Sequence, residues 1–168
     1  MIRRTALVSF CLALATTWLA VQVAAAPPKA LPPLTFTTLD GKTIESVDLQ
    51  GKVVLLDFWA SWCIPCRKSF PEIDRLSKDF ASKGVTVIAV NVDEQRKNAD
   101  AFLLQYPHSM TVAFDSKGAS ARAFDLQGMP SSLIIDRGGR VRFTHMGYTD
   151  KTIAQFRTEI AQLLTEAQ

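Results

Sequence analysis

The sequence predicts an α/β domain, in which one mixed β-sheet carries helices on both faces. Two apolar runs, residues 53–59 and 85–92, are typical of strands that are covered on both sides. Each run is followed by a segment with helical periodicity, and an amphipathic helix over residues 151–166 ends the chain. Alternating strands and helices of this kind form a sheet between helical layers. We find no internal repeat and no second domain in the sequence.

The predicted elements follow one another closely along the chain. Strands over residues 34–39 and 42–44 flank Asp40-Gly41, which is a hairpin turn signal. The first buried strand leads into a helix whose apolar residues fall three or four apart, and Gly84 ends that helix. The remaining elements are a strand over 85–92, a helix over 96–105, a strand over 110–114, a short helix over 119–124, a hairpin of strands 132–135 and 140–144, and the last helix.

Residues 1–25 are typical of an export signal. Arg3 and Arg4 are the only charges in this segment, the apolar stretch covers residues 6–23, and small residues follow at 24–26. The uncharged stretch is roughly 20 residues long, so it also suits an uncleaved membrane anchor. Under either interpretation the basic start stays inside and the rest of the chain faces outward. We therefore expect a periplasmic protein, either secreted across the inner membrane or anchored with its domain facing the periplasm.

Residues 26–33 form a proline-rich spacer that we expect to be extended and exposed, and the folded domain is expected over 34–168. The chain has 19 basic and 16 acidic residues, a net charge of +3. Without Arg3 and Arg4 the balance is 17 against 16. A protein so close to neutral has little to drive counterion release, and we expect no nucleic-acid partner.

Outside the leader, which contains Cys11, the chain has two cysteines, Cys63 and Cys66. Two cysteines cannot build the disulfide framework of a small secreted scaffold, and they fall short of the four ligands of a structural zinc site. His108 and His145 are the only histidines, and neither has ligand spacing to a partner. We expect no bound metal and no cofactor.

The position of the two cysteines gives them a redox chemistry. Cys63 follows a buried strand and opens a helix, where free backbone N–H groups and the helix dipole favour a thiolate. Cys66 is three residues away, close enough to close an intramolecular disulfide. Pro65 fits the first helical turn, which needs no N–H from it. Cys63 would attack a partner's disulfide, and Cys66 would resolve the mixed disulfide.

The segment from Asp57 to Cys66 resembles the active-site segment of thioredoxin-fold proteins. The wider pattern is similar to the TlpA/ResA branch, which comprises exported or membrane-tethered thiol-disulfide oxidoreductases. It includes residues 39–42, 51–55, 70–71 and 87–93. The resemblance extends from Leu34 to the carboxyl end. It implies a thioredoxin-like fold with an N-terminal β-hairpin extension and an inserted strand/helix segment after the second core strand. It also implies protein disulfide clients and a membrane-embedded thiol reductant as electron donor.

The resemblance also assigns roles by position. Cys63 matches the nucleophile and Cys66 the resolving cysteine of a redox disulfide. Asp57 matches a buried acid that accepts the proton of the resolving cysteine, although a carboxylate turned to solvent remains the alternative. Met129-Pro130 matches the cis-proline loop that contacts substrate; the alternative is an ordinary edge-strand proline. The predicted substrate-binding residues are Trp62, Ile64, Pro65, Met129 and Pro130.

Two positions depart from the family pattern. Ser69 stands where cytochrome-maturation members often carry a glutamate, which argues against that specialised role without affecting the thiol chemistry. Ala89 replaces a lysine that accompanies the buried acid in many thioredoxins. Two other functions also remain. One is a copper-carrying module that uses both cysteines, with or without His145. The other is a peroxidase. It fits less well, because Trp59 and Ala60 stand where the peroxidases of this fold carry a threonine.

Overall fold

The computed structural model describes residues 29–166, so the predicted export signal over residues 1–25 lies outside the described residues. One sheet joins the strands in the order β1-β8-β7-β4-β5-β6-β2-β3. Its strands are β1 (Lys29–Ala30), β2 (Thr35–Thr38), β3 (Thr43–Glu45), β4 (Val53–Trp59), β5 (Val85–Asn91), β6 (Thr111–Phe114), β7 (Ser131–Ile135) and β8 (Arg140–Met146).

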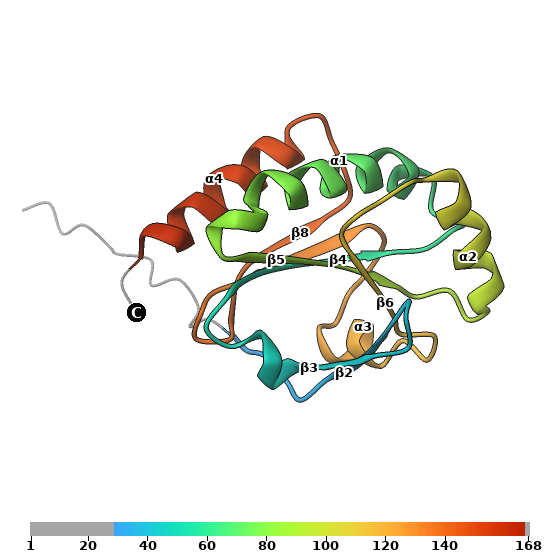
Figure 1. Ribbon diagram of the computed structural model, residues 1–168, viewed down its shortest axis with the longest axis horizontal. Coiled ribbons are helices and arrows are strands. Elements are labelled where there is room, and N and C mark those ends of the chain that lie inside the picture. Colours follow the sequence, from blue (N-terminus) through green and yellow to red (C-terminus); the bar gives the residue numbers. More distant parts are fainter. Residues whose placement is uncertain (1–28, 167–168) are drawn as a thin grey trace, which may run out of the picture.

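Within residues 29–166, four α-helices and two 3-10 turns accompany the strands, and the last helix follows the last strand. They are α1 (Ile64–Phe80), α2 (Arg96–Gln105), α3 (Ala119–Ala123) and α4 (Thr152–Thr165), with η1 (Ser46–Leu49) and η2 (Ala81–Lys83). The predicted α/β class is confirmed, including the amino-terminal hairpin β2–β3 and the α2–β6 insertion after β5. Figure 1 shows α1 and α4 side by side over one face of the sheet and α3 on the other face.

Strand β4 lies at the centre of the sheet. It runs parallel to β5 and antiparallel to β7, with Leu55 opposite Val87 on one side and Ile134 on the other. All seven of its residues are buried, as the uninterrupted apolar run predicts. Because successive side chains point to opposite faces, Leu55 and Trp59 pack beneath α1 and α4. Asp57 lies between them in the strand and therefore faces the same helical layer.

The ordered sheet begins earlier than the sequence predicts. Lys29 and Ala30 are exposed, as expected of the spacer over residues 26–33, but they pair with Val141 and Arg140 of β8 and so form an edge strand of the sheet. The pairing is antiparallel and spans only two residues. A strand this short has no periodicity of its own, and its partner lies more than a hundred residues later.

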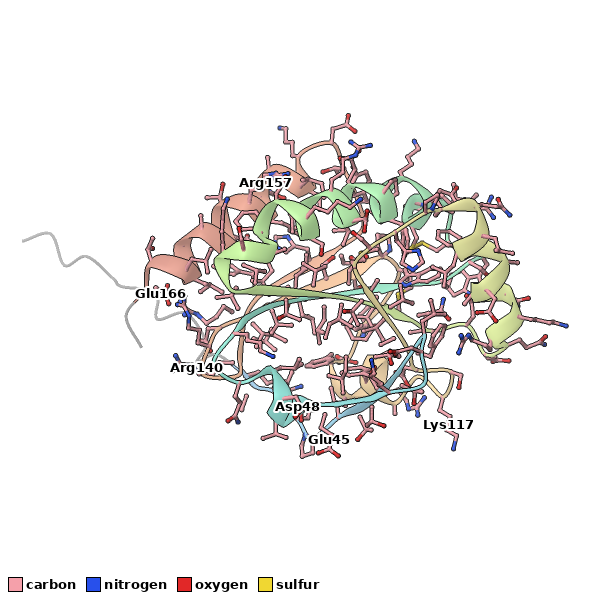
Figure 2. The ribbon with its side chains drawn as sticks, viewed as in Figure 1. Glu45, Asp48, Lys117, Arg140, Arg157 and Glu166 are labelled. Atoms are coloured by element: carbon pink, nitrogen blue, oxygen red, sulfur yellow. A yellow bond between two sulfur atoms is a disulfide. The ribbon has the colours of Figure 1, made fainter. Side chains whose placement is uncertain are left out.

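The end of the sheet opposite the cysteines is held by an ion-pair network. Asp136, just after β7, is bonded by Arg140 and Arg142, and Arg142 also pairs with Glu166 beyond α4. Arg140 and Glu166 lie at the same end of the molecule in Figure 2. The network ties the end of α4 to the β7–β8 hairpin. Among residues 29–166, no helix has both the length and the apolar character needed to cross a membrane.

Candidate active site

The two cysteines lie at the connection between β4 and α1. Four residues separate Trp59, the end of the strand, from Ile64, the first residue of the helix. Cys63 is the N-cap of α1 and Cys66 is in its first turn. They form a disulfide with their Cα atoms 5.3 Å apart. Cys63 is 4% exposed and Cys66 is fully buried, so Cys63 is the sulfur nearer to solvent.

The helix start supplies a hydrogen bond to Cys63. The backbone N–H of Cys66 donates to Cys63 Sγ over 3.2 Å. Pro65, in the same turn, has no N–H to donate. When the disulfide is reduced, this amide and the positive end of the helix dipole favour a thiolate at Cys63. The arrangement suits a nucleophile at Cys63.

An apolar rim surrounds the disulfide. Trp62, Ile64 and Pro65 are exposed, although two of them are large hydrophobic residues. Such exposure is expected where another molecule binds rather than where the chain packs on itself. The rim stands directly beside Cys63 in the sequence and in the structure.

The loop before β7 lies at the same edge of the sheet. The Met129-Pro130 peptide bond is cis, with Met129 half-buried and Pro130 buried. Ser131, which follows, pairs with Phe58 near the end of β4. Because β7 runs antiparallel to β4, it begins where β4 ends. The loop and the disulfide therefore lie at one end of the sheet, and Met129 packs against the core cluster that contains both cysteines.

Asp57 is a carboxylate inside the core. It is 1% exposed, so it is not turned to solvent. The hydroxyl of Ser132 donates to Asp57 Oδ1 over 2.6 Å, whereas Oδ2 has no hydrogen-bond partner within residues 29–166. Burial raises the pKa of Asp57 from 3.8 to about 7, and the bond from Ser132 acts in the opposite direction. The acid can therefore gain and lose a proton near neutral pH.

Sequence reasoning missed a second buried acid, Asp93, which holds the loop before Cys63. Its carboxylate accepts from the backbone N–H and the hydroxyl of Ser61, each over 2.9 Å. Asn91 Nδ2 donates to the same carboxylate over 2.8 Å. The sequence could have indicated Asp93 by its position just after β5, which runs parallel to β4, because parallel strands end at the same edge of a sheet. Asp93 thus anchors the segment that carries Trp62 and Cys63.

A hollow of about 310 Å³ opens beside the rim, between the start of α1 and α2. Trp62 and Arg67 line one side, and Phe102 and Tyr106 line the other. Arg67 Nη2 donates to the carbonyl of Ser61, so it braces the same loop that Asp93 holds. The hollow continues the exposed surface of the rim towards α2.

His145 is engaged with a carboxylate. Its Nε2 lies 2.7 Å from Glu159 Oε2, on α4. Within residues 29–166 no cluster of three or more histidine, cysteine, aspartate or glutamate side chains is placed to hold a metal ion. His145 is therefore not brought together with the two cysteines as a third ligand for copper.

Known proteins resemble the chain in sequence and in structure. Thiol-disulfide oxidoreductase ResA of Bacillus thuringiensis subsp. konkukian is 37% identical over 113 residues, which cover 67% of this chain and 65% of that protein. The chain thus spans 65% of the length of this curated relative, slightly less than two thirds.

Solved structures extend the similarity over more of the chain. A Chlorobium tepidum chain, provisionally assigned as thiol:disulfide interchange protein DsbE, has 39% identity and a TM-score of 0.78, covering 82% of this chain and 96% of that one. A thiol:disulfide interchange protein of the thioredoxin family from Chlorobium tepidum TLS has 30% identity and a TM-score of 0.72, covering 84% and 99%. The predicted thioredoxin-like fold is confirmed. The Redoxin family pattern matches residues 26–161, and the chain therefore belongs to the Redoxin family.

Proposed function

We propose that this protein is a thiol-disulfide oxidoreductase that reduces disulfides in client proteins through Cys63 and Cys66. One observation carries the proposal: the two cysteines are joined at the amino terminus of α1, with the more accessible sulfur on the N-cap. The names of the ResA relatives, thiol-disulfide oxidoreductases, support the same activity.

The cycle begins with the reduced pair. The Cys63 thiolate attacks one sulfur of a client disulfide, the client S–S bond breaks, and the other client sulfur leaves as a thiolate. Cys66, as a thiolate, then attacks Cys63 Sγ and displaces the second client sulfur. The Cys63–Cys66 disulfide forms, and two electrons have passed to the client. In the structure Cys63 and Cys66 are joined by a disulfide, which is the form that this cycle would produce.

Asp57 serves as the proton acceptor in the second half of the cycle. Cys66 is fully buried, and burial opposes the charge of a thiolate. A base with a pKa of about 7 is well matched to accept a proton at neutral pH and return it later. Ala89, the β5 residue opposite Asp57, supplies no charge. Asp57 is then the acid on β4 that handles this proton.

Clients bind along the apolar rim and the loop before β7. Trp62, Ile64 and Pro65 present exposed surface beside Cys63. The backbone of Met129, next to Pro130, would pair with an extended client segment. Pairing of this kind uses main-chain hydrogen bonds and tolerates different side chains. The site therefore suits exposed disulfides in extended or unfolded protein segments.

The protein acts as a reductant in the periplasm. Ile64 and Pro65, between the cysteines, have no side-chain donor to stabilise the Cys63 thiolate, so the dithiol form is not strongly favoured. A reductant outside the cytoplasm must be re-reduced after each cycle, and a membrane-embedded thiol reductant fills that role. Residues 1–25 supply the export signal or anchor.

Reduction of insulin by dithiothreitol tests the activity. We expect the protein to accelerate precipitation of the insulin B chain in proportion to its concentration, because dithiothreitol regenerates the Cys63–Cys66 dithiol. Absence of any acceleration, with the disulfide shown to be reducible, would contradict the proposal.

Two exposed aliphatic residues separate client contact from general surface effects in the same assay. Ile64 is 71% exposed beside Cys63, and Leu104 is 86% exposed on α2. Ile64→Ser should raise KM for insulin about threefold to tenfold, since it removes apolar contact with the client. The control Leu104→Ser should keep the wild-type KM. Equal effects of the two variants would remove Ile64 from the client surface.

A further inference from the structure

Ser132 and Asp57 lie opposite each other on two neighbouring strands. They are register partners on β7 and β4, so their side chains lie on the same face of the sheet. The Ser132 hydroxyl donates to Asp57 Oδ1 over 2.6 Å. Ser132 is 3% exposed and Asp57 is 1% exposed. In this dry setting an aligned hydrogen bond to a charged acceptor has a large effect on that charge.

The surroundings of Asp57 contain few other polar groups. From β5 its register partner is Ala89. The core cluster on the helical face contains Cys63, the N-cap of α1, and Cys66 of the first turn, which are joined in the disulfide. From β8, His145 is the register partner of Ser132, and it is engaged with Glu159 of α4. Within residues 29–166, Ser132 is the one donor to the Asp57 carboxylate.

We propose that Ser132 is a positioning residue for proton exchange at Asp57, holding Oδ1 in a hydrogen bond and leaving Oδ2 as the oxygen that takes the proton. This inference rests on the proposed role of Asp57. In the resolving step the Cys66 S–H bond breaks and an Oδ2–H bond forms. The electron pair left on sulfur then attacks Cys63 Sγ, the Cys63–Cys66 bond forms, the bond from Cys63 to the client breaks, and the client sulfur leaves as a thiolate. The same proton returns through Oδ2 when the pair is reduced again.

The hydroxyl also sets the pH at which this exchange works. Burial raises the pKa of Asp57 to about 7, and the Ser132 bond keeps it from rising further because it stabilises the charged form. Without the hydroxyl the acid would hold its proton at neutral pH. Ser132 thus keeps a deeply buried acid usable as a base in the pH range where the protein works.

The neighbouring serine provides a matched control. Ser131 is 2% exposed, and its hydroxyl donates over 2.6 Å to the carbonyl of Gly128. Because it precedes Ser132 in the strand, its side chain lies on the opposite face of the sheet from Asp57. Ser131→Ala removes the same atom from the same strand without touching the carboxylate. Ser132→Thr is the conservative variant, since it keeps the hydroxyl.

Carbon-13 NMR of the aspartate carboxyl groups in the full domain tests the inference without relying on activity. We expect Ser132→Ala to raise the Asp57 titration midpoint by about one pH unit. Ser132→Thr should stay closer to the wild-type midpoint than Ser132→Ala, and Ser131→Ala should keep it. An unchanged midpoint in Ser132→Ala, or the same change in Ser131→Ala, overturns the proposal.

A kinetic measurement separates this inference from the proposed role of Asp57. Attack of Cys63 on dithiobis(nitrobenzoate) releases one thionitrobenzoate and leaves the other bonded to Cys63. Cys66 then displaces the second thionitrobenzoate, and stopped-flow absorbance follows this second release. Asp57→Asn should abolish the rise of this rate around pH 7, and Ser132→Ala should move the rise to higher pH. If Asp57→Asn keeps the wild-type profile, the proton role of Asp57 fails and the inference fails with it. If only Ser132→Ala keeps that profile, the inference alone fails.

Discussion

Cys66→Ser should trap the protein on its clients, whereas Cys63→Ser should abolish exchange. With serine at 66, Cys63 still attacks a client disulfide, but no second thiol displaces the client. The mixed disulfide therefore accumulates. Removing Cys63 eliminates the sulfur at the helix start, and we expect the rate of client reduction to fall roughly a thousandfold or more. Non-reducing electrophoresis and peptide mapping of the linked products measure both outcomes.

The double variant Cys63→Ser/Cys66→Ser is the control, and it should form no linked product. Cys66 is fully buried and Cys63 is 4% exposed, so of these two residues we expect Cys63 to make the first attack. Trapping by Cys63→Ser together with turnover by Cys66→Ser would reverse the assignment of the two roles.

Asp57→Asn should change how stability depends on pH. Burial raises the pKa of Asp57 from the ordinary value of 3.8 to about 7 in the folded protein. Between these values the folded state binds more protons than the unfolded state, so the stability of the wild-type protein falls as pH rises through this window. The full penalty, on the order of 4 kcal/mol, is present above pH 7. The asparagine variant lacks this loss.

Urea unfolding of the oxidised protein at pH 4, 6 and 8 measures the effect. The free energy of unfolding of Asp57→Asn should increase relative to that of the wild-type protein as pH rises. The difference should approach the full charge penalty by pH 8. Asp79→Asn is the control, because Asp79 is an exposed carboxylate that pairs with Arg157 at the surface. It should follow the wild-type trend. Parallel curves for Asp57→Asn and the wild-type protein would show that Asp57 does not carry this charge penalty.

Elements with a long local pattern could be predicted from the sequence. The residues of β4 were predicted without error, as were those of α2, because a continuous apolar run and a helical repeat are properties of neighbouring residues. The turn η1 and the strand β1 were missed. A four-residue turn has no repeat, and β1 exists only because β8, far along the chain, offers it an edge.

The candidate site divides in the same way. The cysteines and the buried setting of Asp57 follow from spacing and from the apolar strand around them. The hydrogen-bond partners of Asp57 and Asp93 do not follow from the sequence. Ser132 reaches Asp57 across 75 positions, and Ser61 reaches Asp93 across 32, so each bond depends on strand register and loop path. A single sequence carries no direct signal of such pairings.

Equilibration with glutathione tests the central claim most directly, because it asks whether Cys63 and Cys66 exchange with another disulfide and in which direction. The oxidised protein is incubated in buffers of graded reduced-to-oxidised glutathione ratio, and alkylation followed by mass spectrometry gives the reduced fraction. The account predicts full, reversible exchange with a potential more negative than about −220 mV, as expected of a reductant. A potential of about −120 mV, like that of the strong oxidants of this fold, would contradict it. A pair that never exchanges would contradict it as well.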